Sequence, residues 1–167
     1  MAFAALNDLD ILAADVGNAY LQAPPREKVH TTTGPEFGPT NVGKTVIIVR
    51  AMYGLKFSGA TWHAKLSETL RGMDFIPSYA DPDVWMQPAT KDNNFQYIEY
   101  ILIYVNDILV ISAAPLPIMK TIQKAYRLKE EPCAPKTYLG ATIKPWTIPG
   151  ETRSVWSMNS THYLKEA

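Results

Sequence analysis

Asp15, Asn106 and Asp107 are the residues of this sequence whose types and positions could support metal chemistry. Asn106 and Asp107 interrupt the apolar run YIEYILIYVNDILVISA, and Asp15 ends the alternating segment LDILAADV. Carboxylate and amide oxygens are hard ligands of the kind that Mg²⁺ prefers, and two such ions can stabilise the attacking and leaving oxygens of a phosphoryl transfer. A plain hairpin turn is the alternative for residues 106–107, because Asn and Asp are favoured in turns. Residue types alone leave both interpretations open.

The hydrophobic pattern predicts the elements that would position these residues. It indicates strands over 9–16, 83–87, 95–104, 107–113, 137–146 and 152–158, and a buried strand that begins at 45. It also indicates a short helical turn at 17–23, helices over 58–75 and 115–131, and a helix that begins at 160. The order β-α-β-β-α-β predicts an α+β fold, with helices on one face of an antiparallel sheet. In this arrangement the end of the first strand and the tip of the central hairpin can lie side by side. We therefore expect Asp15 to meet Asn106 and Asp107.

Composition restricts the possible classes of protein. The 167 residues fit one compact domain with a sizeable core, since 47% are hydrophobic and 19% charged. The formal net charge of zero argues against a free-standing nucleic-acid binder that works by electrostatics. A single cysteine, Cys133, excludes an internal disulfide framework and a cysteine-rich zinc site. We predict neither secretion nor a membrane span, because no signal peptide and no apolar run of about 20 residues is evident.

Five ordered blocks give the sequence a family resemblance. They are DVGNAYLQA (15–23), RAMYGLKFSGATWH (50–63), ADPDVWM (80–86), YVND (104–107) and YLGATI (138–143). In this order they resemble the reverse transcriptases of copia-type LTR retrotransposons (Pseudoviridae), from about residue 8 to about residue 164. The resemblance implies an RNA-directed DNA polymerase with a ferredoxin-like palm, an antiparallel sheet with helices on one face. It also implies palm with partial fingers over 1–147, where 24–50 is an irregular connection, and a strand and the start of a truncated thumb helix over 148–167.

The resemblance also implies roles for the acidic residues. Asp15, Asn106 and Asp107 match the catalytic positions, which would act by two-metal nucleotidyl transfer. Two Mg²⁺ (or Mn²⁺) ions are implied as cofactors. Asp15 and Asp107 would bind them, together with the backbone carbonyl of Val16 and, more weakly, Asn106.

Further positions match the substrate contacts of the family. Tyr20 is implied to lie under the sugar and to exclude a ribonucleotide, while Tyr53, Gly54 and Lys56 match the segment that supports the incoming nucleotide or the template. The implied partners are an RNA or DNA template-primer, dNTP, and the rest of a polyprotein with its fingers, RNase H and integrase, without a membrane. The implied location is cytoplasmic, in virus-like particles, with the nucleus as the alternative.

The sequence departs from the family at two points. The family motif is YVDD, and its first Asp is here Asn106, whose amide is neutral and cannot offset the charge of a metal ion. The family's fingers segment before the first block and most of the thumb do not appear in these residues. We therefore expect a palm-region fragment with impaired activity. A non-catalytic nucleic-acid-binding module and an inert retrotransposon remnant, both on the same fold, are the alternatives.

Overall fold

The computed structural model of the chain describes residues 1–150 and 154–161. Its contacts divide the chain into two units, one formed by Met1–Gly17 with Leu70–Ala167 and the other by Asn18–Thr69. Each unit is described by itself. The helix predicted to begin at 160 lies mostly in residues 162–167, outside the described residues. No helix among the described residues combines the length and the apolar character needed to cross a membrane.

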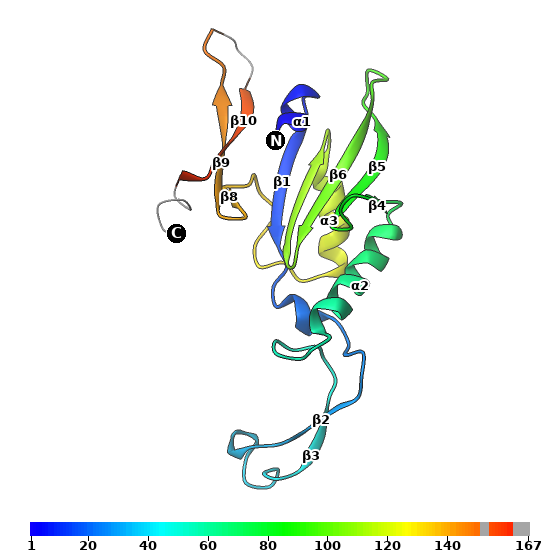
Figure 1. The fold of residues 1–167 in the computed structure, drawn as a ribbon, viewed down its shortest axis with the longest axis vertical. Helices are drawn as coiled ribbons and strands as arrows, with labels where there is room; N and C mark the ends of the chain where they lie inside the picture. The colour runs from blue at the N-terminus through cyan, green and yellow to red at the C-terminus, as the bar shows by residue number, and fades with distance from the viewer. Residues whose placement is uncertain (151–153, 162–167) are drawn as a thin grey trace. The chain divides into compact units, whose positions relative to one another are not determined.

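The first unit is built on a five-stranded antiparallel sheet with the order β1-β7-β6-β5-β4 (Figure 1). Its strands are β1 (Asp10–Asp15), β4 (Ile76–Pro77), β5 (Val84–Thr90), β6 (Gln96–Tyr104) and β7 (Asp107–Ser112). The strands expected from the alternating and apolar segments are thus present, and β6 and β7 form the expected central hairpin. A mixed helix and strand architecture with an antiparallel sheet is confirmed.

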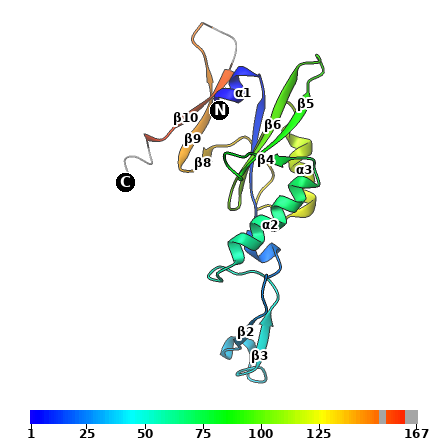
Figure 2. The same ribbon diagram turned by 45° about the vertical axis from the view of Figure 1, so that its right-hand side comes forward.

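Both faces of this sheet are covered within the first unit. Helix α3 (Pro115–Ala125) packs against β1 and β7. On the other side lie α1 (Ala2–Leu6) and a three-stranded antiparallel sheet of β8 (Thr137–Tyr138), β9 (Ala141–Thr147) and β10 (Ser154–Asn159) (Figures 1 and 2). The buried residues between the sheets form one cluster of Ala4, Leu9, Ile11, Tyr97, Leu109, Ile111 and Ile143. Burial of these side chains stabilises the strands that carry the acidic residues.

The segment after α3 differs from its prediction. The charged run RLKEE was expected to continue the helix to 131, but α3 ends at Ala125, because Tyr126 adopts an extended backbone and its side chain is buried. The chain then runs antiparallel to β1, with bridges between Val16 and Leu128 and between Ala13 and Cys133. β1 stands at the edge of the sheet, so this segment satisfies backbone groups that the edge would leave unpaired.

The second unit contains a hairpin and most of a helix. Its elements are η1 (Ala19–Gln22), β2 (Val29–Thr32), η2 (Pro35–Phe37), β3 (Thr45–Ile48) and α2 (Ser58–Arg71), whose last two residues belong to the first unit. The strand expected to begin at 45 is present as β3, but its expected burial is wrong. Among the described residues β3 pairs with β2 alone, and Val46 and Ile47 are exposed. A two-stranded ribbon has no second layer to bury its faces. The spacing of apolar residues predicts a buried stripe of Trp62, Leu66, Leu70 and Met73 on this helix, and the first three are buried. Met73 is only partly buried and lies beyond the end of α2.

Candidate active site

A two-residue turn carries the acidic tip of the central hairpin. Tyr104 pairs with Asp107, so Val105 and Asn106 alone connect β6 to β7. Val105 has a φ of 56°, a left-handed conformation that a β-branched residue rarely adopts. Such backbone persists only where the surrounding structure enforces it. The turn therefore holds Asn106 and Asp107 in one fixed register at the end of the sheet.

The end of β1 lies beside this turn. Asp15 is the direct register partner of Asp107 across the β1–β7 pair, and side chains opposite each other on antiparallel strands share a face. The next residue, Val16, is fully buried and donates its backbone N–H to the carbonyl oxygen of Asn106 at 2.8 Å. The structure thus brings together Asp15, Asn106 and Asp107, as the β-α-β-β-α-β order predicted. Their catalytic roles, and a metal contact by the Val16 carbonyl, stay predictions.

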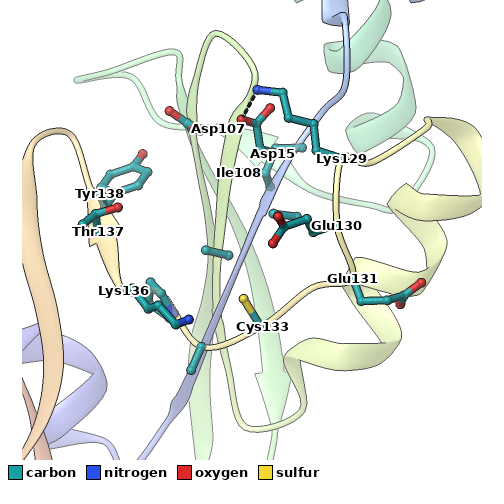
Figure 3. A pocket seen from close by; sticks show the side chains of 14 residues that line it. Asp15, Asp107, Ile108, Lys129, Glu130, Glu131, Cys133, Lys136, Thr137 and Tyr138 are labelled. Atoms are coloured by element: carbon teal, nitrogen blue, oxygen red, sulfur yellow. Dashed lines mark hydrogen bonds and ion pairs between the residues drawn. The ribbon is translucent and has the colours of Figure 1, made fainter.

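Both carboxylate oxygens of Asp15 accept hydrogen bonds. The side-chain amide nitrogen of Asn106 donates to Oδ1 at 2.6 Å. The ammonium of Lys129 donates to Oδ2 at 2.5 Å, as Figure 3 shows. The backbone N–H of Lys129 also donates to the backbone carbonyl of Asp15 at 2.8 Å. Sequence reasoning missed Lys129, because RLKEE was interpreted as a solvated helix end. The Pro132 and Pro135 that follow were the available signal, since proline favours an extended chain before it.

A cavity of about 340 Å³ opens beside the carboxylates, between β1, β7, the segment 129–136 and β8 (Figure 3). Its lining carries both signs of charge: besides Asp15 and Asp107 it includes Lys129, Glu130, Lys136 and Tyr138. The cavity has room for part of a substrate next to Asp107. Its mixed charge distinguishes it from a purely cationic phosphate pocket.

Asp107 and Tyr138 have shifted pKa values. Burial raises the pKa of the Asp107 carboxyl above 3.8, the neighbouring Asp15 raises it further, and Lys129 opposes the shift. Burial also raises the pKa of Tyr138 to about 12, with the charge of Asp107 as the next cause. The Tyr138 hydroxyl is therefore a neutral group at neutral pH. Asp107 is a carboxylate that the folded site disfavours in its charged form, as expected where a cation would relieve the repulsion.

Replacing Asp107 by Asn is expected to leave the free energy of unfolding at pH 7 unchanged or higher. The raised pKa means that the folded state takes up a proton before the unfolded state does. The ionised Asp107 carboxylate therefore lowers the free energy of unfolding by its full amount above the folded-state pKa. This loss of stability is relieved as pH falls toward 3.8. The stability advantage of Asp107→Asn over wild type should shrink between pH 7 and about pH 4. Urea unfolding of both proteins at the two pH values measures it.

Asp15→Asn is the matched control for this comparison. It removes the negative charge that pairs with Lys129 and leaves a neutral acceptor for the hydrogen bond from the Asn106 amide. It should therefore lower the free energy of unfolding at pH 7 by about 1–2 kcal/mol. If the wild-type chain is more stable than Asp107→Asn at pH 7, the charged Asp107 carboxylate does not destabilise the folded state and the prediction is wrong.

The donor set fits a divalent ion only in part. Asp15 and Asp107 are two carboxylates on neighbouring strands, and Mg²⁺ is commonly held by one or two carboxylates with water and substrate phosphates completing its shell. Asn106 does not extend the set, because its amide nitrogen rather than its oxygen faces Asp15. Within residues 1–150 and 154–161, no group of three or more His, Cys, Asp or Glu side chains is placed to hold a metal ion. The residues fit one ion completed by substrate better than two.

The residues expected to contact nucleotide lie in the second unit. The rings of Tyr20 and Tyr53 pack together with centroids 4.5 Å apart, and a Cβ added at Gly59 would lie 3.5 Å from the Tyr20 hydroxyl. Gly54 has a φ of 91°, with open space where a Cβ would be, and the Lys56 ammonium lies 5.3 Å from the centre of the Phe57 ring. Tyr20 and Tyr53 thus form one aromatic pair, while the roles of Tyr20, Tyr53, Gly54 and Lys56 toward substrate stay predictions.

The α+β fold places two aspartates opposite each other, Asp15 at the end of β1 and Asp107 at the start of β7. Proteins that bind a divalent cation between neighbouring strands are the class that this arrangement suggests. Comparison with known proteins makes this specific, since a family model described as "Reverse transcriptase (RNA-dependent DNA polymerase)" matches residues 1–147. The chain belongs to this reverse transcriptase family. No solved structure matches the chain.

The similar curated proteins are polyproteins of plant transposons. The "Retrovirus-related Pol polyprotein from transposon RE1" of Arabidopsis thaliana is 30% identical over 109 residues, covering 65% of this chain and 7% of that protein. The one from transposon TNT 1-94 of Nicotiana tabacum is 28% identical over 114 residues, covering 66% and 8%. The one from RE2 of Arabidopsis thaliana is 31% identical over 97 residues, covering 58% and 6%. The expected copia-type relationship is confirmed, and the chain spans less than a tenth of the length of these relatives.

Proposed function

We propose that this chain is the palm-centred part of the RNA-directed DNA polymerase of a copia-type retrotransposon polyprotein, with a nucleotidyl-transfer site impaired by Asn106. The observation that carries the proposal is the register pairing of Asp15 with Asp107 beside the hairpin turn. Membership of the reverse transcriptase family supports the same activity.

Asp15 and Asp107 are the residues that would hold Mg²⁺ or Mn²⁺, with the Val16 carbonyl as a further ligand by family resemblance. A divalent ion, when bound, would supply positive charge that stabilises the reacting phosphoryl oxygens of the transfer. Val105 and Val16 hold the two strand ends in place, so the main chain that carries the two carboxylates needs no rearrangement. Tyr20 would lie under the sugar of the incoming dNTP.

The impairment follows from the chemistry at position 106. A carboxylate there would give the site a third negative charge, whereas the Asn106 amide is neutral and donates its N–H to Asp15. One carboxylate oxygen of Asp15 therefore accepts a hydrogen bond from the protein itself and is not free for a metal ion. The site keeps its framework and has lost part of its attraction for divalent cations.

The proposed organisation follows the family. Residues 1–147 would be palm with partial fingers, and 148–167 would lead into the thumb. Template-primer and the other parts of the polyprotein, including RNase H and integrase, would be its partners, in the cytoplasm within virus-like particles.

A chimeric enzyme tests the polymerase assignment. The Asn106→Asp form of residues 1–147 replaces the corresponding segment of the tobacco TNT 1-94 polyprotein, and extension of a DNA primer on an RNA template is measured with Mg²⁺. We expect extension that is lost in Asp15→Ala and retained in Asp10→Ala, an exposed aspartate at the other end of β1. A chimera in which Asp15→Ala extends primers as well as its parent would contradict the proposal. A parent chimera that extends no primer would also contradict it and would favour the non-catalytic or inert alternative.

A further inference from the structure

The ion pair between Lys129 and Asp15 has a consequence for metal binding that rests on the proposed function. We propose that Lys129 is a tethered counter-ion, whose ammonium occupies the cation-binding side of Asp15 and must leave before a divalent ion can bind there. With Nζ on Oδ2 at 2.5 Å and the Asn106 amide on Oδ1 at 2.6 Å, both oxygens of Asp15 are already engaged. A metal ion at Asp15 has to displace at least one of these donors.

The backbone of Lys129 is fixed, whereas its side chain can swing away from the carboxylate. Its N–H donates to the Asp15 carbonyl at 2.8 Å, and the flanking residues are held by the Val16–Leu128 bridge and by the bond from Gly17 N–H to the Arg127 carbonyl at 2.9 Å. The Lys129 side chain is 55% exposed, and its ammonium can rotate into water without opening the core. The ammonium is therefore held near Asp15 at high effective concentration and remains displaceable.

The charges of the site favour this exchange mechanism. Asp15 and Asp107 together carry two negative charges when ionised, and Lys129 cancels one of them. Around the cavity, Glu130 and Lys136 contribute one charge of each sign. Glu131 also lines the cavity, but its carboxylate is paired with the Lys120 ammonium at 2.8 Å, so the local balance is unchanged. A divalent ion that approaches Asp15 meets a site of reduced negative charge and an ammonium that repels it. Removing the ammonium should strengthen divalent-ion binding more than removing a lysine elsewhere in the same cavity.

Mn²⁺ binding to the full 167-residue chain tests the proposal without reference to activity. Free Mn²⁺ is measured by electron paramagnetic resonance during titration of wild type, Lys129→Met, Lys129→Arg and Lys136→Met. We expect Lys129→Met to bind Mn²⁺ at least about tenfold more tightly than wild type. Lys129→Arg, which keeps the charge, should stay within about threefold of wild type. Lys136→Met loses the same net charge from the same cavity and should also stay within about threefold.

Paramagnetic broadening of backbone amide signals by Mn²⁺ locates the bound ion, which should affect residues near Asp15 and Asp107. Thermal unfolding verifies that each variant is folded, and Lys129→Gln with the same expected tightening replaces Lys129→Met if that variant is not. Equal affinities for wild type and Lys129→Met, or equal tightening in Lys136→Met, would overturn the counter-ion role.

The two proposals fail in distinguishable ways. If even an Asn106→Asp, Lys129→Met double variant binds no Mn²⁺ near these residues, both the metal-dependent function and the counter-ion role are wrong. An inactive chimera together with tighter Mn²⁺ binding by Lys129→Met would overturn the polymerase assignment and support the counter-ion.

Discussion

Primer extension by the chimeric enzyme is expected to be about a hundredfold faster, or more, when residue 106 is Asp than when it is Asn. The aspartate adds a negative charge next to Asp15 and removes the amide N–H that now occupies Asp15 Oδ1 at 2.6 Å. A unit charge pair about 4 Å apart interacts by about 4 kcal/mol at an effective dielectric constant of about 20, and a divalent ion doubles the charge product. Repulsion among three carboxylates in the metal-free site offsets much of this attraction. The expected increase in rate is therefore set at about a hundredfold, well below what the full Coulomb energy would give.

Single-turnover extension at several Mg²⁺ concentrations measures this effect. The Asn106→Asp form should need less Mg²⁺ for half-maximal rate, because the added charge acts on metal binding. Asn94→Asp, in the turn between β5 and β6 of the same sheet, makes the same chemical change away from the site and should leave the rate unaltered. Equal rates for the Asn106 form and the Asn106→Asp form at all Mg²⁺ concentrations would show that position 106 does not limit catalysis.

Leu109→Ala is expected to lower the free energy of unfolding by about 3 kcal/mol. Leu109 is 1% exposed, belongs to the core cluster between the two sheets, and lies on β7 two residues after Asp107. Truncating it removes buried apolar surface and leaves a cavity that the strands on either side can fill only in part. Because domains are stable by only about 5–15 kcal/mol, this loss is a large fraction of the total.

Urea unfolding followed by circular dichroism measures the loss. Leu116→Ala is the matched control, since Leu116 lies in α3 with 49% of its surface exposed and alanine suits a helix. Its effect should stay within about 0.5 kcal/mol. Similar losses for the two variants would contradict the assignment of Leu109 to the core.

The apolar and alternating segments were sufficient to predict the central part of the fold. LDILAADV and the run around YVND predicted β1 and the β6–β7 hairpin, because a roughly alternating segment and an apolar run with a two-residue polar break both favour strands. The approach of Asp15 to Asp107 followed from topology alone. The roles assigned to Tyr20, Tyr53, Gly54 and Lys56 came from family resemblance, and no contact in the structure tests them.

Lys129 and the β2–β3 ribbon could not be predicted in the same way. Lys129 reaches Asp15 across 114 positions of sequence only because the chain leaves the helix at Tyr126 and pairs with the edge of β1. Local helical spacing through Ile122 and Tyr126 contains no information about that edge. For β3, the run VIIV has the composition of a buried strand, but burial depends on a covering layer, which Val46 and Ile47 lack.

The turn between β6 and β7 also bears on how reversible the loss of charge at position 106 is. The main chain there is held by the Tyr104–Asp107 pair and by the bond from Val16 N–H to the Asn106 carbonyl, and neither involves the side chain of residue 106. Asn and Asp have nearly the same shape, and their codons differ by one base. A single-base change could therefore place an aspartate at position 106 while these backbone contacts stay in place.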